Sequence, residues 1–308
     1  MRENIALMVL GGLLALPHFA WFSPAHAELN VVTTTTDLAA IAQWVGGDDV
    51  TVEALTPGTR DPHYAEARPS MIRKVNRADL VIAIGAELEI GWLPAALDAG
   101  RNSAVYPGRD GYLDVSQSIP LLDIPEGPID RAMGDVHASG NPHYWLDPNN
   151  GLRMAQAISA RMALLDPQRA NAYQARLTSF ESELAVRLAV WRATLAPLSG
   201  EAFVQYHRSL TYLADAFDLR VVDEVEPLPG IAPSVSDLVA LTEVMRREQV
   251  RGILMESYYD QRPATFLAEK TGAAVIALPH SVGARPDIET YFDLMEAIVG
   301  GFRDAGLI

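Results

Sequence analysis

One helical pattern in this chain is much longer than an ordinary helix. It opens at Asp166-Pro167 and runs to about Leu195, whereas the mean helix of a globular protein has ~11–12 residues. Its apolar residues follow the 3.6-residue period of an amphipathic helix, at Tyr173, Leu177, Phe180, Leu184, Leu188 and Trp191. Pro197 and Gly200 end the pattern. A helix of this length is able to bridge two domains rather than cap one sheet.

Strand and helix patterns alternate on both sides of this helix. Before it, strands are predicted at 29–35, 50–55, 80–84 and, weakly, 104–106, with helices at 37–45, 68–76, 88–97 and 151–164. After it, strands are predicted at 202–206, 219–223, 250–255 and 273–278, with helices at 209–217, 234–248, 264–271 and 288–302. Residues 108–141 show no period and are predicted to form a long loop near a site.

Such alternation is typical of parallel sheets with helical crossovers. We therefore predict an α/β fold with two parallel-sheet lobes, 28–165 and 198–308, joined by a rigid linking helix at 166–197.

The first 27 residues have the pattern of a secretory signal peptide. Arg2 precedes an apolar run from Ile5 to about Phe22, and Ala25-His26-Ala27 is a small-x-small cleavage site. We expect cleavage before Glu28 and a periplasmic protein; an uncleaved anchor is the alternative. No cysteine follows the run, so no lipoprotein anchor is expected.

The composition of the chain limits its partners and the kinds of site that it can form. The net charge of −15 and the pI of about 4.8 argue against nucleic acid as a partner. The chain has no cysteine, which excludes disulfides, thiolate metal sites and cysteine nucleophiles. Any site for a soft metal must therefore use histidine and carboxylate.

Histidines follow several of the predicted strands. Of the seven, His18 and His26 fall within the signal, and four of the other five follow a strand or stand in a proline turn: His63, His143, His207 and His280. Ligands of open parallel sheets bind at the carboxyl ends of strands, and each lobe supplies two of these histidines. A cleft between the lobes could gather all four into a metal site.

Two further side chains have less certain roles. His137, in the loop, is predicted to lie at the surface or to act as an accessory in metal capture. Glu256 ends the strand beside the one that leads to His280. It could bind metal directly, accept an N–H from a ligand histidine, or be an ordinary solvated acid.

Several motifs resemble those of the metal-binding proteins of zinc and manganese ABC importers. They span essentially the whole chain after residue 27: Asp61-Pro62-His63 with Glu66 and Arg68-Pro69-Ser70; Asp79-Leu80-Val81; Pro142-His143-Tyr144-Trp145-Leu146-Asp147-Pro148; Tyr206-His207 with Tyr212-Leu213 and Phe217; and Met255-Glu256-Ser257. The resemblance implies two lobes joined by a rigid helix, a metal site at their interface, and His63, His143 and His207 as ligands.

The chain departs from this family's pattern in two places. His280 stands where the family usually has an aspartate, so the fourth ligand is open among His280, Glu256 and water. The 108–141 loop is acidic but nearly free of histidine, which makes a chelating loop less expected.

The ligand types favour one metal. Three or four imidazoles suit tetrahedral Zn²⁺, whereas Mn²⁺ prefers carboxylate and water; copper and nickel would also accept histidine. We predict a monomer that captures zinc for the membrane permease of an ABC importer. A periplasmic metallochaperone is an open alternative as the donor of the metal. The absence of H-E-x-x-H and G-x-S-x-G motifs argues against a zinc-dependent hydrolase, and a surface adhesin is a further alternative.

Overall fold

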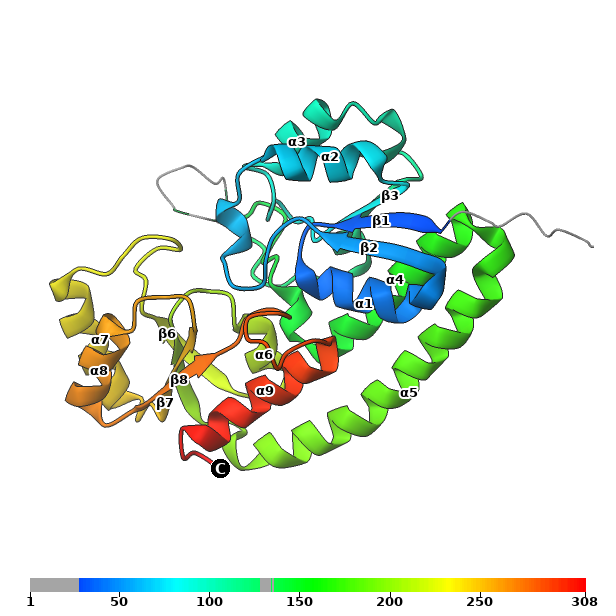
Figure 1. Ribbon diagram of the computed structural model, residues 1–308. Coiled ribbons are helices and arrows are strands. Elements are labelled where there is room, and N and C mark those ends of the chain that lie inside the picture. Colours follow the sequence, from blue (N-terminus) through cyan, green and yellow to red (C-terminus); the bar gives the residue numbers. More distant parts are fainter. Residues whose placement is uncertain (1–27, 128–133, 135) are drawn as a thin grey trace, which may run out of the picture.

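Two parallel four-stranded sheets form the framework of the protein (Figure 1). The computed structural model describes residues 28–127, 134 and 136–308; the predicted signal peptide lies outside them. The first sheet has the order β2 (Val50–Ala54), β1 (Leu29–Thr33), β3 (Leu80–Ala83), β4 (Tyr112–Asp114). The second has the order β6 (Arg220–Glu224), β5 (Ala202–Gln205), β7 (Gly252–Glu256), β8 (Ala274–Leu278). This confirms the predicted α/β class with two lobes.

Helices cover both sheets, as parallel strands require. The first lobe has α1 (Thr36–Gly46), α2 (Pro69–Arg77) and α3 (Leu93–Gly100), followed by α4 (Pro148–Leu165). The second has α6 (Thr211–Ala216), α7 (Val235–Arg247), α8 (Arg262–Thr271) and α9 (Tyr291–Asp304). Short 3-10 turns of the first lobe include η2 (Pro62–Tyr64) and η6 (Tyr144–Leu146).

The long helix is present as α5 (Ala170–Leu195), preceded by a 3-10 turn at Pro167–Arg169. Figure 1 shows it running along the outside of the molecule from one lobe to the other. Five of the six predicted stripe residues are buried, and Leu188 is half-buried. The ring of Phe180 lies 5.9 Å from that of Trp44 in α1 and 4.9 Å from that of Phe292 in α9. One hydrophobic core therefore includes residues of both lobes and of the linking helix.

The predicted strand at 104–106 is wrong. Ser103–Val105 forms a 3-10 turn, and the edge strand β4 lies later, within the segment predicted to be a loop. The cause is Asn102, whose side chain accepts from the Ala104 amide and donates to the Ala78 carbonyl. These local bonds compete with strand pairing.

The helix predicted at 88–97 begins later than expected, at Leu93. Gly85, Ala86 and Glu87 all have positive φ, and the buried Glu89 side chain accepts from the amides of Ile84 and Gly85. The chain therefore makes a tight turn after β3 before the helix starts.

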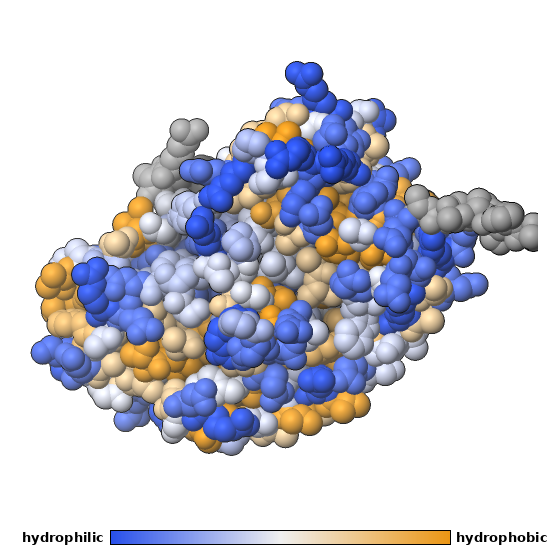
Figure 2. Space-filling model, in the orientation of Figure 1, coloured by the Kyte–Doolittle hydropathy of each residue, from blue (hydrophilic) through white to orange (hydrophobic). Residues whose placement is uncertain are grey.

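Polar and apolar residues are interspersed on the face shown in Figure 2. An apolar patch at the left edge lies over the start of α7, where several aliphatic side chains are exposed: Leu228, Ile231, Val235 and Val239. Within the described part of the chain, no helix combines the length and hydropathy needed to cross a membrane.

Candidate metal centre

His63 lies in the first lobe, in the 3-10 turn η2 that follows β2. Asp61 caps this turn: one carboxylate oxygen accepts from the His63 amide at 2.9 Å and from Nδ1 of the ring at 2.7 Å. The Trp92 indole donates to the Pro62 carbonyl at 3.0 Å. The backbone and the ring of His63 are therefore both fixed by their surroundings.

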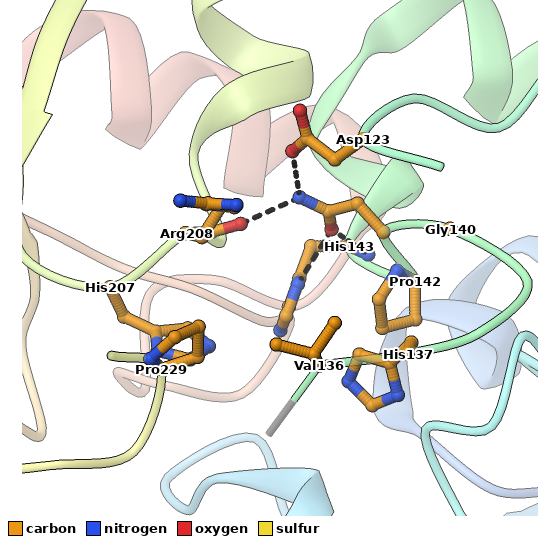
Figure 3. A pocket seen from close by; sticks show the side chains of 10 residues that line it. Asp123, Val136, His137, Gly140, Pro142, His143, His207, Arg208 and Pro229 are labelled. Atoms are coloured by element: carbon orange, nitrogen blue, oxygen red, sulfur yellow. Dashed lines mark hydrogen bonds between the residues drawn. The ribbon is translucent and has the colours of Figure 1, made fainter. Parts of the chain in front are cut away.

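His143 is held by an equivalent arrangement at the start of η6. Asn141 Oδ1 accepts from the His143 amide at 3.0 Å and from the ring Nδ1 at 2.9 Å. The amide nitrogen of Asn141 donates to Asp123 at 3.0 Å and to the Arg208 carbonyl at 2.6 Å, as the dashed lines in Figure 3 show. These bonds orient the Asn141 amide so that its oxygen faces the histidine.

His207 comes from the second lobe, directly after β5. Its Nδ1 lies 2.8 Å from Glu226 Oε2, and that oxygen also accepts from the Gly230 amide at 2.8 Å. The side chains of His207 and Glu226 are only 5% and 6% exposed. A buried, charge-assisted hydrogen bond of this kind fixes the orientation of the ring.

These three histidines meet between the lobes. One ring nitrogen of each lies within 4.8 Å of the others. In all three rings Nδ1 bonds to an oxygen acceptor, which leaves the lone pair on Nε2. Ligand histidines in metalloproteins are typically oriented by such a bond from the other ring nitrogen.

The electrostatics favour a neutral imidazole at His143. Burial, together with the neighbouring His63 and His207, lowers the pKa of His143 well below its usual value. Burial opposes ionisation of Asp61, but its contact with His63 outweighs this and lowers the pKa of the carboxyl. Neutral imidazole is the form that binds a metal cation.

His280 is close to this group but not part of it. It follows β8, its ring centroid is 5.8 Å from that of His143, and Trp145 lies edge-on at 4.9 Å. The ring is 1% exposed, and its Nε2 has no hydrogen-bond partner among the described residues. Burial lowers the pKa of His280 to about 3, so the ring is neutral at physiological pH.

Glu256 also lies beside the group. It is fully buried; one carboxyl oxygen meets the Ser209 hydroxyl, and Oε2 has no partner in the part of the chain that the structure describes. Burial raises its pKa well above the usual value, and the charges of Asp61 and Glu226 add to the shift. Burial therefore favours the protonated form of Glu256, which would have to lose its proton to bind a metal.

His137 is closer to the centre than the sequence indicated. Its Nε2 lies 3.1 Å from Nε2 of His63, and the two rings stack at 5.2 Å. Because His63 donates Nδ1–H to Asp61, its Nε2 accepts here and His137 donates. No periodicity in the 108–141 loop could have placed this side chain.

The oxygen acceptors of His63, His143 and His207 were not predicted from the sequence. Asp61 and Asn141 share a local signal, because each stands two residues before its histidine with proline between. Glu226 had no such signal, since it reaches His207 from 19 residues away.

A small cavity of about 30 Å³ opens beside the three-histidine group. It is lined by His137, His143 and His207 together with loop residues of both lobes, including Val136, Arg208 and Pro229 (Figure 3). A space of this size is enough for a single water or ion.

Known proteins share this architecture. Residues 31–305 match the family described as ZnuA, zinc-uptake complex component A periplasmic. The high-affinity zinc uptake system protein ZnuA of Paracoccus denitrificans is 27% identical over 318 residues, covering 91% of this chain and 93% of its own. The manganese ABC transporter substrate-binding lipoprotein PsaA of Streptococcus pneumoniae is 25% identical over 283 residues, covering 89% and 87%.

A crystal structure of ZnuA superposes with a TM-score of 0.74 at 24% identity, over 91% of this chain and 99% of that one, which shows that the fold is shared. The chain belongs to the ZnuA family of metal-binding, substrate-binding proteins of ABC transporters.

Proposed function

We propose that this protein binds one Zn²⁺ ion in the periplasm and delivers it to the membrane permease of an ABC importer. The observation that supports this most strongly is the convergence of His63, His143 and His207, each with Nδ1 bonded to an oxygen acceptor. Three imidazoles held in this way suit a tetrahedral zinc site. Zinc is the cargo of the protein and takes part in no reaction here.

The ligand types favour one of the two metals named for the relatives. Manganese prefers carboxylate and water oxygens, and the three-histidine group contains no carboxylate. Burial raises the pKa of Glu256 well above its usual value, which disfavours the carboxylate form that manganese would need. We therefore assign zinc rather than manganese as the preferred ion.

His280 is the best candidate for the fourth ligand. It is buried and neutral, and its Nε2 has no hydrogen-bond partner among the residues that the structure describes, whereas burial favours the protonated form of Glu256. Zinc would give the Nε2 lone pair of His280 the partner that it lacks. A water molecule in the fourth position is the alternative.

His137 has an accessory role in this proposal. Its N–H occupies the lone pair of His63 Nε2, so an incoming ion has to displace it. His137 then leaves the centre or adds a ligand from the loop side. We expect no catalytic turnover, because the family to which the chain belongs consists of substrate-binding proteins of ABC transporters.

The test is a metal titration of residues 28–308, prepared without metal. Elemental analysis and competition with a chelator are expected to give one zinc per chain, bound much more tightly than manganese. His207→Ala should weaken zinc binding strongly, whereas replacing a surface residue such as Glu269 by Gln should not. Absence of stoichiometric binding of any divalent transition metal would refute the proposal.

A further inference from the structure

The loop at residues 280–282 follows β8 of the second lobe, yet its hydrogen bonds go to the first lobe. The Thr36 hydroxyl donates to the Val282 carbonyl at 2.6 Å, and the Val282 amide donates to Asp37 Oδ1 at 2.9 Å. Both side chains belong to the first turn of α1. The Trp145 indole donates to the His280 carbonyl at 2.9 Å. Side chains of the first lobe therefore fix this loop at both of its ends.

The first lobe also approaches the loop closely through its backbone. A Cβ atom placed on Gly58 would lie 1.9 Å from the Val282 carbonyl oxygen, so only glycine fits there. This contact leaves the 280–282 loop little freedom to shift toward the first lobe.

Burying the carboxyl of Asp37 at this contact costs free energy. It is 0% exposed, and its second oxygen, Oδ2, has no hydrogen-bond partner within the described residues. A buried carboxyl with an unsatisfied oxygen destabilises a fold, and an apolar residue would avoid that cost. What the Asp37 carboxyl supplies at this buried position is the acceptor for the Val282 amide.

Ser281 connects Asp37 to the ring of His280. Ser281 lies against Asp37, and the Ser281 hydroxyl is 3.3 Å from Nδ1 of His280. In His63, His143 and His207 the Nδ1 atom also meets an oxygen, and Nε2 is left for a ligand. His280 follows the same pattern, with Ser281 as the oxygen.

We propose that Thr36 and Asp37 are positioning residues for His280: they fix the 280–282 loop on the first lobe and so hold the imidazole beside the other three histidines as the fourth zinc ligand. This inference rests on the proposed function of the centre. It assigns to α1, which contributes no ligand, part of the control of metal affinity. Loss of a residue that orients a ligand typically costs 10–100-fold in metal affinity.

The test uses two matched pairs of variants in residues 28–308. Thr36→Val removes the hydroxyl donor, whereas Thr36→Ser keeps it. Asp37→Ala removes the acceptor for the Val282 amide, whereas Asp37→Asn keeps an oxygen there. Zinc affinity is measured by chelator competition, with thermal unfolding of the metal-free variants to verify the fold. We expect Thr36→Val and Asp37→Ala to weaken zinc binding about 10-fold or more, and the conservative partners to stay within about 3-fold of the unsubstituted protein.

The same substitutions are then made in a His280→Ala background. A residue that acts through His280 has no further effect once that ring is gone, whereas a merely structural residue weakens binding equally in both backgrounds. Equal losses in both backgrounds, or unchanged affinity in folded Thr36→Val and Asp37→Ala, would overturn the inference. A His280→Ala protein that binds zinc as tightly as the unsubstituted chain would also overturn the inference. If the unsubstituted protein binds no zinc, the proposed function itself fails, which is a separate result.

Discussion

Glu226 contacts the ligand His207 and is not itself a proposed metal ligand, yet its replacement is expected to weaken zinc binding. Its Oε2 atom accepts from His207 Nδ1 and from the Gly230 amide, both at 2.8 Å, in a nearly buried setting. Hydrogen bonds to charged groups contribute about 1.5–3 kcal/mol, and neutral ones about 0.5–1.5. Glu226→Gln keeps an acceptor but loses the charge, a difference of about 1 kcal/mol, or roughly 5-fold in affinity. Glu226→Ala loses the acceptor as well and should cost about 10–100-fold.

The assay is chelator competition at neutral pH, with the melting temperature of each metal-free variant as a check on folding. Glu248→Gln is the control, because Glu248 also pairs with a basic side chain, Arg220 at 3.0 Å, but lies away from the centre on the surface. We expect the order of affinity to be unsubstituted and Glu248→Gln, then Glu226→Gln, then Glu226→Ala. A folded Glu226→Ala protein that binds zinc within twofold of the unsubstituted chain would show that orientation of His207 is not needed.

Three further predictions concern stability and the fourth ligand. Burial raises the pKa of Glu89 to about 7 from 4.5, so the folded state keeps a proton that the unfolded chain loses, and stability falls as pH rises through this window. Glu89→Gln lacks this loss. Urea unfolding should therefore show the unfolding free energy of Glu89→Gln rising relative to that of the unsubstituted protein between pH 4 and 8 by roughly 3 kcal/mol, since each unit of the pKa difference between 4.5 and about 7 is worth about 1.36 kcal/mol; a constant difference would contradict the raised pKa. Phe180→Ala should lower the unfolding free energy by about 3–5 kcal/mol, because the ring is fully buried between the lobes. Val186, on the same helix, is 67% exposed, so Val186→Ala should change the unfolding free energy by less than about 0.5 kcal/mol. Equal effects of the two substitutions would mean that α5 does not join the two lobes. Glu256→Gln should retain zinc affinity within about twofold while His280→Ala loses about 10-fold or more, and the reverse order would make Glu256 the fourth ligand.

The sequence predicted the architecture well because its signals are local. The stripe from Tyr173 to Trp191 and the apolar strands each follow from residues close together in the chain. The errors occurred where side chains bond to the backbone. Asn102 turned an expected strand into a 3-10 turn, and Glu89 delayed a helix by bonding back to the amides before it. Such bonds are determined by packing in three dimensions, which a periodicity cannot report.

The centre was predicted in part for the same reason. Four histidines could be selected because strand ends and proline turns are visible in the sequence. Whether each ring takes part depends on contacts between distant residues. The approach of His137 to His63 spans 74 residues, the bond of Glu226 to His207 spans 19, and the contact of Asp37 with the loop of His280 spans 245. Only the Asp61 and Asn141 acceptors stood close enough to their histidines to be found from the sequence.

X-ray absorption at the zinc edge of the loaded protein tests the central claim most directly, because it counts the ligands and identifies imidazole. The proposed centre predicts at least three imidazole nitrogens at about 2.0–2.1 Å, and a fourth that disappears in His280→Ala. A first shell made mainly of oxygen, or fewer than three imidazoles, would contradict the assignment of His63, His143 and His207 as zinc ligands.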